Sequence, residues 1–454
     1  MGRLFGTDGI RGEANQYPMD GLTAFRVGQA IAVTIKEDAG DRKPVVIIGK
    51  DTRISGDMLE GALSAGITSM GVDVCPIGVL PTPAIAYFTI TTGARAGVVI
   101  SASHNPFRDN GIKIFGNNGF KLSDKQEAVI ESLVFENDVS EFMPLPENLG
   151  CIRTISNSLE QYVAFLKGHF PDDFSLTGMK IVLDTANGAT HEIAPLLFEA
   201  LGAGLSVIHH QPNGININDR CGSQHTEDLE SEVLRKEADA GFAFDGDGDR
   251  LIAVDETGRK LTGDQILLIC ARSLKEAGQL TNNLLVSTVM SNLGLTRACR
   301  EYGIDRHESA VGDRYVLADM QAHGSVLGGE ESGHIILLDH HTTSDGIITA
   351  LKLLVAMIET GETLSELAKL MTVYPQKLIN VPVREKRDIS TVPKLVESIR
   401  QVEAELGDEG RVLVRYSGTQ NLCRVMVEAA TMAMTEKCCR LIADQVRKTL
   451  GSEM

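Results

Sequence analysis

The stretch Ser101–Pro106 (SASHNP) joins hydroxyl, imidazole and amide side chains directly after the apolar run 96–100. A short apolar run of this kind predicts a buried strand, and a loop at its end would hold reactive side chains on a rigid element. The stretch is therefore a candidate active-site loop with two candidate serines, Ser101 and Ser103. The same residues also fit an ordinary serine turn closed by Asn-Pro, and the pattern alone favours neither interpretation.

A second loop, Asp245–Arg250 (DGDGDR), alternates three aspartates with two glycines. In an extended turn the carboxylates converge on one side, and the glycines let the backbone approach closely. Three close negative charges repel one another unless a cation neutralises them, and an all-oxygen set suits Mg²⁺ or Ca²⁺. Octahedral Mg²⁺ would complete its shell with water or phosphate oxygens, so the loop indicates a metal site for phosphoryl transfer.

Two alternatives compete for this aspartate loop. An EF-hand is suggested by Glu256, which falls at the twelfth position from Asp245. However, Arg250 stands where that motif needs glycine, and the apolar flanks 242–244 and 251–254 resemble strands. The other alternative is a solvated acidic turn, which the apolar flanks disfavour. We therefore prefer a catalytic metal site.

Groups that could hold phosphate occur elsewhere in the chain. The stretch Arg415–Thr419 (RYSGT) combines a fork-shaped cation with hydroxyls and a glycine, and Arg424 follows on the next expected strand. An ordinary hairpin would fit that stretch equally well. Arg11 and Lys113 lie near other conformationally restricted turns, although a lone basic residue is usually a solvated surface charge.

A third loop, Gly328–His334 (GGEESGH), mixes carboxylate, hydroxyl and imidazole groups. A sugar presents neighbouring hydroxyls that a carboxylate can accept and a serine can bridge. By itself this loop is weak evidence for sugar binding.

The order of elements that must position these loops is an alternating one. The runs 45–48, 181–183 and 284–286 predict short buried strands, each followed by a polar turn and a helical pattern. Roughly forty to sixty residues after each comes a second expected strand that ends in one of the three loops, a spacing that suits βαβ units. We expect three diverged copies of one mixed α/β domain.

The last part of the chain has a different pattern. A strand is predicted over 378–383, a helix that opens at Pro393 and is capped by Gly407, two strands around Tyr416, and a final helix toward Leu450. This βαββα order predicts a smaller α+β domain. Together the patterns predict domains over residues 1–150, 151–256, 257–371 and 372–454.

Composition narrows the function classes. The 454 residues carry a net charge of −18, which repels nucleic acid phosphates and anionic membranes, so we expect neither as a partner. No signal-peptide pattern or membrane-spanning apolar run is present. The eight cysteines are scattered without metal-site spacing and are expected to be reduced and mostly buried. These features predict a cytoplasmic protein.

Five motifs together resemble the α-D-phosphohexomutase superfamily over the whole chain and in the expected order. They are Phe5–Gly12, Ser101–Pro106, Asp245–Arg250, Gly329–His334 and Arg415–Thr419. Three further stretches are similar to the branch that acts on glucosamine phosphates, namely 287–295, 311–315 and 374–376. The resemblance implies a heart-shaped enzyme with three related mixed α/β domains and a smaller C-terminal α+β domain.

The resemblance also implies roles for individual residues. The catalytic set matches Ser103 as a phosphoserine, with His104, Lys113 and Arg11. The metal set matches Ser103, Asp245, Asp247 and Asp249, which would hold one Mg²⁺ per chain. The substrate set matches Glu330, Ser332, His334 and Arg250, with Arg415, Ser417, Gly418, Thr419 and Arg424 at a second phosphate site. One departure is Gln420-Asn421, where the superfamily frequently has Glu-Pro, which leaves the affinity and mobility of that phosphate loop open.

The activity implied is the interconversion of glucosamine 6-phosphate and glucosamine 1-phosphate through a bisphosphorylated sugar, feeding UDP-N-acetylglucosamine synthesis. Phosphorylation of Ser103 would be required, a sugar bisphosphate would act as activator, and a homodimer is expected. Two alternatives stay open. A phosphomannomutase or phosphoglucomutase would share every catalytic motif, whereas a non-catalytic protein that binds a metal or a phosphosugar would bind without isomerisation.

Overall fold

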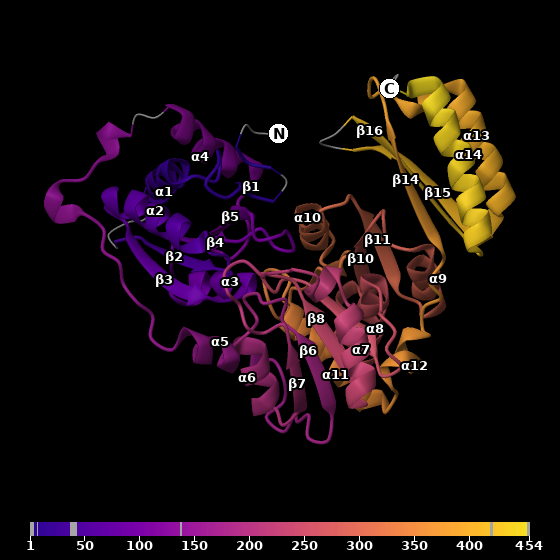
Figure 1. Ribbon diagram of the computed structural model, residues 1–454, viewed down its shortest axis with the longest axis horizontal. Helices are drawn as coiled ribbons and strands as arrows, with labels where there is room; N and C mark the ends of the chain where they lie inside the picture. Colours follow the sequence, from indigo (N-terminus) through magenta and orange to yellow (C-terminus); the bar gives the residue numbers. More distant parts are fainter. Residues whose placement is uncertain (1–3, 7, 37–42, 137–138, 418–420, 452–454) are drawn as a thin grey trace. The chain divides into compact units, whose positions relative to one another are not determined.

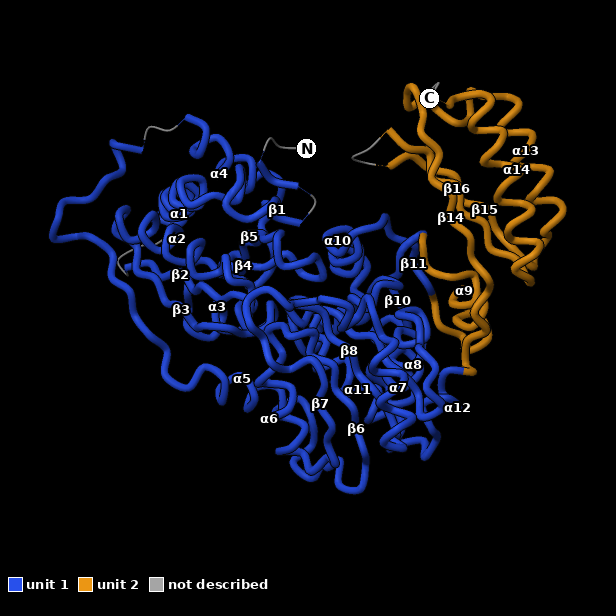
Figure 2. Tube along the Cα trace, viewed as in Figure 1, with its two compact units in different colours: residues 1–289, 306–368 blue, residues 290–305, 369–454 orange. Residues whose placement is uncertain are grey.

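The computed structural model describes residues 4–6, 8–36, 43–136, 139–417 and 421–451. The chain divides into two compact units (Figure 2). The first comprises residues 1–289 and 306–368, and the second comprises residues 290–305 and 369–454. Among the described residues, no helix is long and apolar enough to cross a membrane.

Three mixed β-sheets form the framework of the first unit (Figure 1). The first sheet has the order β1-β5-β4-β2-β3, from β1 (Ile10–Glu13), β2 (Val45–Lys50), β3 (Asp73–Val79), β4 (Ala96–Ile100) and β5 (Asp109–Gly116). The second has the order β7-β6-β8-β9, from β6 (Lys180–Asp184), β7 (Gly204–Ile208), β8 (Ala240–Phe244) and β9 (Leu251–Asp255). The third has the order β11-β10-β12-β13, from β10 (Leu284–Thr288), β11 (Asp305–Ser309), β12 (Leu327–Gly329) and β13 (Ile335–Leu337).

All three sheets repeat one pattern of strand pairing. A parallel pair (β2 with β4, β6 with β8, β10 with β12) is followed by an antiparallel partner (β5, β9 or β13). The three loops that carry the predicted functional residues occupy the same connection in each copy, between the last parallel strand and its antiparallel neighbour. The expected three copies are confirmed, and their topology explains why each copy delivers one functional loop.

The helices of the first unit connect and cover these sheets. Around the first sheet they are α1 (Gly21–Lys36), α2 (Gly56–Ser69), α3 (Thr82–Thr91) and α4 (Asp124–Glu136). Around the second they are α5 (Ser158–Lys167), α6 (Ile193–Ala200) and α7 (Glu227–Lys236). With the third come α8 (Gly263–Glu276), α10 (Asp313–His323), α11 (Gly346–Thr360) and α12 (Leu364–Ala368).

Alternate residues of the first sheet face different helices, as the two-residue period of a strand requires. Ile48 and Val98 belong to the core that contains residues of α1 and α2. Gly49 and Gly97, each next to one of these residues in its strand, approach the α3 side chains closely. A Cβ at Gly97 would lie 2.2 Å from Thr89 Oγ1, so only glycine fits there. The serine loop therefore starts from a strand that is packed on both faces.

The second unit is a three-stranded antiparallel sheet covered by helices. Its elements are α9 (Leu293–Glu301), β14 (Gln376–Pro382), α13 (Pro393–Leu406), β15 (Gly410–Tyr416), β16 (Leu422–Ala429) and α14 (Met432–Leu450), with the sheet order β14-β16-β15. Helix α13 has Pro393 in its first turn and Gly407 at its C-cap, where φ is +52°. The predicted βαββα order is confirmed.

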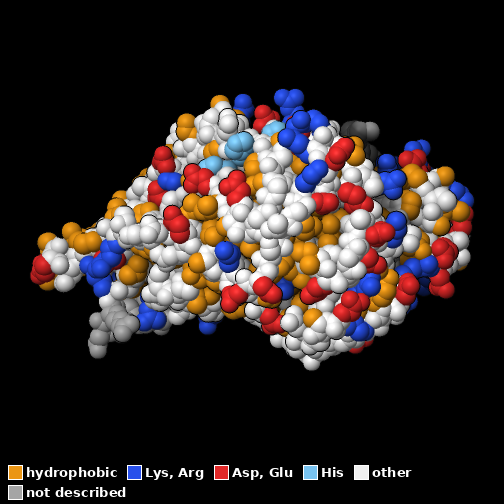
Figure 3. Space-filling view, turned by 90° about the horizontal axis from the view of Figure 1, so that it is seen from below, with side chains coloured by type: hydrophobic (Ala, Val, Ile, Leu, Met, Phe, Trp, Pro, Cys, Tyr) orange, Lys and Arg blue, Asp and Glu red, His pale blue; other side chains and the backbone are white. Residues whose placement is uncertain are grey.

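Seven of the eight cysteines are buried and all are free thiols, as expected, and Cys151 is the exposed one. On the face shown in Figure 3, acidic and basic side chains are interspersed. On this face, an anion would therefore be bound by a local group of basic side chains.

A buried carboxylate ties α9 to the C-terminal sheet inside the second unit. Glu428 on β16 is fully buried, and its Oε2 accepts hydrogen bonds from the Leu293 N–H at 2.8 Å and from Arg411 Nε at 2.7 Å. Gln376 Nε2 donates to Oε1 of the same carboxylate at 2.9 Å. These contacts explain why residues 290–305 belong to the second unit.

Removal of this carboxylate is expected to destabilise the second unit strongly. Glu428→Ala leaves Arg411 and the Leu293 N–H without their buried acceptor, and loss of one partner of a buried ion pair typically costs about 3–5 kcal/mol. The control is Glu405→Ala, because Glu405 pairs with Lys437 at the surface and such pairs contribute about 0–1 kcal/mol. Urea unfolding of the full chain checks both values, and equal costs would contradict the assignment.

A buried histidine in the first unit predicts acid sensitivity. His341 is 6% exposed, its Nδ1 accepts a 3.4 Å hydrogen bond from the Thr343 N–H, and burial together with nearby His169 lowers its pKa to about 3. The ordinary pKa of histidine is about 6.5 in an unfolded chain. The unfolded state therefore takes up this proton first as the pH falls. The stabilising contribution is complete above about pH 6.5 and is lost progressively toward pH 3.

At pH 5 the difference between the pKa of His341 in the folded and in the unfolded chain costs about 2 kcal/mol in the free energy of unfolding. His341→Asn keeps an acceptor near the position of Nδ1 and removes the titration. We expect the free energy of unfolding to fall by about 2 kcal/mol more in the wild type than in the variant between pH 7 and pH 5. Groups that titrate elsewhere affect both proteins equally, so only the difference is compared. Parallel pH profiles from denaturant unfolding would contradict the prediction.

Candidate active site

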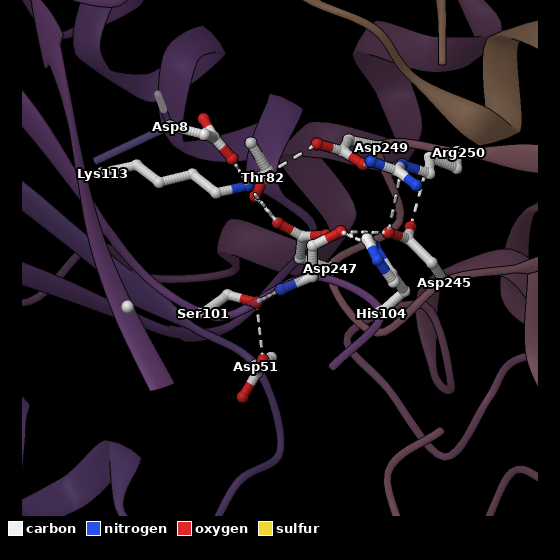
Figure 4. Close-up of polar contacts among 12 residues, drawn as sticks. Asp8, Asp51, Thr82, Ser101, His104, Lys113, Asp245, Asp247, Asp249 and Arg250 are labelled. Atoms are coloured by element: carbon white, nitrogen blue, oxygen red, sulfur yellow. Dashed lines mark hydrogen bonds and ion pairs between the residues drawn. The ribbon is translucent and has the colours of Figure 1, made fainter. Parts of the chain in front are cut away.

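The hydroxyl of Ser103 lies in a buried polar cluster. Figure 4 shows the side chains of its neighbours His104 and Asp245 in this cluster. Ser103 Oγ donates to Asp245 Oδ2 at 2.6 Å and lies 3.2 Å from His104 Nδ1. Ser103 is 2% exposed, and its φ of +53° is in the left-handed region that non-glycine residues rarely adopt. Such strain persists only where the surroundings hold it, which is common at functional sites.

Two groups hold the serine loop in this conformation. Ser101 Oγ accepts the Ser103 N–H at 2.9 Å and donates to Asp51 Oδ2 at 2.6 Å, so Ser101 is a backbone-bonding residue. The buried Arg53 guanidinium, paired with Asp51 at 2.8 Å, donates to the carbonyls of Ser103 at 3.0 Å and Asn105 at 2.8 Å. The loop is thus fixed by charge-assisted bonds to its backbone.

Sequence reasoning did not assign a role to Asp51 or Arg53. The signal that could have identified them is their place directly after the 45–48 strand, at the same edge of the sheet as the serine loop. Asn218 was also missed, and its Nδ2 donates to the Ser103 carbonyl at 2.9 Å from the second sheet's domain. Nothing in the local sequence marks Asn218, because only the tertiary fold brings it to the loop.

The three aspartates predicted as metal ligands come together as expected. Asp245, Asp247 and Asp249 are buried, and one carboxylate oxygen of each lies within 4.8 Å of the others. Burial raises the pKa of Asp245 well above its ordinary value, and the negative charges of Asp249 and Asp247 raise it further. Burial opposes ionisation of Asp249 too, but Lys113 and His334 outweigh it and hold that pKa well below the ordinary value.

The donor set fits a divalent cation with oxygen ligands. Asp247 Oδ1 and Asp249 Oδ1 are buried and have no hydrogen-bond partner among the described residues. Buried carboxylate oxygens without a partner are costly unless a cation takes that place. An all-oxygen set of this kind suits Mg²⁺.

Glycine at position 246 lets the aspartate loop meet the serine loop. A Cβ at Gly246 would lie 2.6 Å from the Ser103 carbonyl oxygen and 2.8 Å from Asn218 Nδ2. Any larger residue would therefore displace the backbone of Ser103. The glycines of this loop serve backbone approach, as the sequence indicated.

Basic groups surround the acidic cluster. Lys113 on β5 is fully buried, with its Nζ 2.8 Å from Asp247 Oδ2 and 3.6 Å from Asp249 Oδ2. Burial disfavours its charge, but Asp247 and Asp8 outweigh that effect and raise its pKa. Arg250 Nε lies 4.0 Å from Asp245 Oδ2. Lys113 and Arg250 thus contact the aspartate cluster directly.

His104 and Arg11 complete the predicted catalytic group. Burial, with Arg250 and Arg11 adding to it, lowers the pKa of His104 to about 4, so this imidazole is neutral at pH 7. A neutral ring beside Ser103 can exchange a hydrogen bond with the hydroxyl without adding charge. Arg11 lies on β1, at the edge of the first sheet, and pairs with Asp8.

A chain of alternating charges leads from this cluster to the third sheet. Asp8 and Asp313 both bind Lys121, and Lys113 Nζ lies 3.4 Å from Asp8 Oδ2. His334 lies between Asp249 and Asp313, and its ring nitrogens are 3.7 Å from Asp249 Oδ2 and 3.9 Å from Asp313 Oδ2. Asp8 and Asp313 fall within the quoted motifs, Lys121 does not, and none of the three was predicted as a site residue. Their pairing depends on contacts between separate domains.

The third loop reaches the same region through its backbone. The Leu251 N–H donates to the Gly333 carbonyl at 3.0 Å, which joins this loop to the end of the aspartate loop. Glu330 Oε1 accepts the Gly312 N–H at 2.9 Å, and Ser332 Oγ is buried without a hydrogen-bond partner among the described residues. Three loops, one from each copy of the domain, therefore meet within the first unit.

In the second unit, two predicted phosphate ligands lie side by side. Arg415 on β15 and Arg424 on β16 are directly paired in the sheet register. Burial, with Arg424 adding to it, lowers the pKa of Arg415, and Nε of both arginines is buried without a hydrogen-bond partner among the described residues. Like charges directly opposite one another are destabilising unless an anion joins them. Ser417 is buried nearby on the chain, whereas Gly418 and Thr419 lie outside the described residues.

Metal binding provides a direct test of the acidic cluster. We expect Mg²⁺ to raise the thermal unfolding midpoint of the wild type, because a ligand that binds only the folded state stabilises it. Asp247→Asn removes one anionic ligand, and we expect at least about a tenfold loss of Mg²⁺ affinity by calorimetric titration. The control is Asp228→Asn, which changes an exposed carboxylate. Equal affinity in Asp247→Asn and the wild type would sink the metal assignment.

Comparison with known proteins gives a consistent result over the whole chain. Profiles described as phosphoglucomutase/phosphomannomutase alpha/beta/alpha domains I, II and III match residues 2–141, 160–258 and 262–374, and the C-terminal domain profile matches residues 378–445. A phosphoglucosamine mutase of Syntrophobacter fumaroxidans is 62% identical over 451 residues, covering 99% of this chain and 100% of that protein. A phosphoglucosamine mutase of Syntrophus aciditrophicus is 54% identical with the same coverage.

Solved structures show the same fold at lower identity. A phosphoglucomutase/phosphomannomutase family protein from Burkholderia thailandensis has a TM-score of 0.81 at 24% identity, covering 98% of this chain and 97% of that one. Aspergillus fumigatus N-acetylphosphoglucosamine mutase, solved with GlcNAc-6P and magnesium, has a TM-score of 0.68 at 18% identity, covering 99% and 96%. The repeated sheets, the meeting of the three loops and these matches lead to one conclusion: the chain belongs to the phosphoglucomutase/phosphomannomutase family.

Proposed function

We propose that this protein is a phosphoglucosamine mutase that interconverts glucosamine 6-phosphate and glucosamine 1-phosphate. The observation that carries the proposal is the buried Ser103 hydroxyl, hydrogen-bonded to one member of a three-aspartate cluster that fits a divalent cation. The specificity for glucosamine rests on the curated relatives, which are phosphoglucosamine mutases at 49–62% identity over nearly the whole chain.

The reaction is two phosphoryl transfers through one serine. With Ser103 phosphorylated, the free hydroxyl of the sugar attacks the phosphorus, the bond to Ser103 Oγ breaks, and a sugar bisphosphate forms. The attacking hydroxyl gives up its proton and the departing Ser103 Oγ takes one up, so no net proton is released. The bisphosphate then turns over and returns its other phosphoryl group to Ser103 Oγ, so phosphate is neither gained nor lost. Ser103 must be phosphorylated for the cycle to begin.

Charge placement explains the residues around that serine. Phosphoserine contributes about −2 and the three aspartates −3, so several cations are needed at one place. Mg²⁺ bound by Asp245, Asp247 and Asp249 would neutralise phosphoryl oxygens. Lys113 and Arg250 already contact these aspartates and would stabilise the charge spread over the transferring group.

The buried neutral His104 contributes hydrogen bonding in place of charge. Its Nδ1 lies 3.2 Å from Ser103 Oγ, within reach of a proton that the serine oxygen gains or loses. Arg11 adds positive charge from the edge of the first sheet. In this proposal His104 exchanges protons with the serine oxygen, and Arg11 stabilises negative charge.

Two further groups would hold the sugar phosphate in both orientations. Glu330, Ser332 and His334 would contact hydroxyls of the sugar ring, which a carboxylate accepts and a serine bridges. The paired Arg415 and Arg424, with Ser417, Gly418 and Thr419, would hold the phosphate that does not react. The unpartnered arginine Nε groups support this role.

The remaining elements of the proposal follow from the family resemblance. They are one Mg²⁺ per chain, activation by a sugar bisphosphate, a homodimer and a role in supplying UDP-N-acetylglucosamine for cell wall precursors. A cytoplasmic location and a division into domains at residues 150, 256 and 371 are proposed from the composition and the sequence patterns. The substrate is a small sugar phosphate, and the net charge of −18 argues against nucleic acid.

Replacement of Ser103 tests the central step. We expect Ser103→Ala to lose essentially all mutase activity and to carry no phosphate by intact mass, because no other hydroxyl occupies its position. The control Ser101→Ala removes a loop contact but keeps the nucleophile, so it should retain the phosphate and a reduced rate. Mg²⁺-dependent turnover is measured with a trace of bisphosphate on glucosamine, glucose and mannose phosphates.

The outcomes separate the alternatives. Turnover by Ser103→Ala would refute the phosphoserine mechanism. A preference for glucose or mannose phosphate would identify the protein as a phosphoglucomutase or phosphomannomutase. Binding of these sugars with no isomerisation by the wild type and no phosphate on its Ser103 would identify a binding protein.

A further inference from the structure

Three metal-ligating side chains meet at a place that the catalytic cluster does not use. His307 lies on β11, the edge strand of the third sheet, and Asp319 and His323 lie one helical turn apart on α10. One ligand atom from each residue lies within 4.8 Å of the others. His307 and Asp319 are each one-third exposed, and His323 is exposed, so an ion could reach them from solvent.

The spacing of these groups suits one small cation. Two ligands bound to the same tetrahedral ion at about 2.1 Å stand about 3.4 Å apart. His307 Nε2 lies 3.6 Å from Asp319 Oδ2, close to that separation. Residues four apart on a helix lie on the same face, so His323 projects beside Asp319 toward the strand. The ligand atoms of the three side chains therefore lie close to the spacing that one ion requires.

The histidine rings are oriented for coordination. His323 Nδ1 lies 2.9 Å from the main-chain carbonyl of Asp319, and the His307 and His323 rings have centroids 4.1 Å apart with planes at 33°. An imidazole that donates from Nδ1 keeps a lone pair on Nε2, which is how second-shell bonds commonly fix a metal-binding histidine. The arrangement therefore presents a nitrogen ligand next to the carboxylate.

The nearest strand cation is directed elsewhere. Arg306 precedes His307 in β11, and its guanidinium donates to Ser287 Oγ at 2.6 Å and to the Thr288 carbonyl at 2.9 Å. Successive strand residues point to opposite faces of a sheet. Arg306 therefore does not occupy the position that a metal would take beside His307.

We propose that His307, Asp319 and His323 bind a divalent transition metal of the zinc class, at a site separate from the catalytic Mg²⁺ site. Two imidazoles and one carboxylate suit Zn²⁺, Co²⁺ or Ni²⁺, whereas Mg²⁺ prefers oxygen ligands alone. Three protein ligands leave a fourth position for water. The bound ion ties β11 to the C-terminal turn of α10. At the N-terminal end of α10, the Gly312 N–H donates a hydrogen bond to Glu330 of the third loop.

Calorimetric titration of the full-length protein with Zn²⁺, in saturating Mg²⁺, tests this site. We expect one Zn²⁺ per chain that His307→Gln and His323→Gln each weaken at least about tenfold. Titration with Co²⁺ should give a visible absorption band in the wild type that both variants lose. The control His210→Gln changes an exposed histidine outside the cluster and should bind as the wild type does.

Both variants replace partly or fully exposed side chains, so their unfolding midpoints without zinc should match that of the wild type. Equal Zn²⁺ affinity in the wild type and both variants would overturn the proposal. A loss of the same size in His210→Gln would overturn it as well, because binding would then be a property of exposed histidines in general.

Discussion

The concentration of negative charge in one buried place is the constraint on which the rest of the first unit depends. Three aspartates bring carboxylate oxygens within 4.8 Å of one another, away from water, and such a group is unstable without cations close by. Lys113 supplies one charge directly, and Arg250 and His334 approach the same carboxylates. Residual anionic oxygens are left for a metal, and the Ser103 hydroxyl is bonded to one of these aspartates.

Three copies of one domain bring together the loops that form this cluster. In each copy the functional loop follows the last parallel strand and precedes its antiparallel partner, so three similar frameworks deliver three chemically different loops. Because each strand is packed on both faces, its loop starts from a fixed position. The serine loop needs additional support, since its left-handed Ser103 is held by Arg53 and Asn218 from outside the loop.

The phosphate recognition that we propose for the second unit follows a similar principle with opposite charge. Arg415 and Arg424 face each other in adjacent strands, an arrangement that is unfavourable until an anion joins them. Glu428 lies four residues further along β16, and its charge is compensated within the protein by Arg411 and by the start of α9. One charged group of this sheet is thus satisfied internally, and the other is left available for a ligand.

The sequence by itself determined the element order, the three-copy organisation, the βαββα end and the residues of the main loops, because hydrophobic periodicity and motif spacing are local properties. It also singled out the aspartates and the serine loop, since clustered carboxylates and a polar loop after an apolar strand are visible in the chain, and the family resemblance implied Ser103 rather than Ser101. Only the tertiary structure decided which distant groups complete the site. Asp51, Arg53, Asn218 and Asp313 act through contacts between segments far apart in sequence, and burial, which sets the neutral state of His104, exists only once the domains pack together.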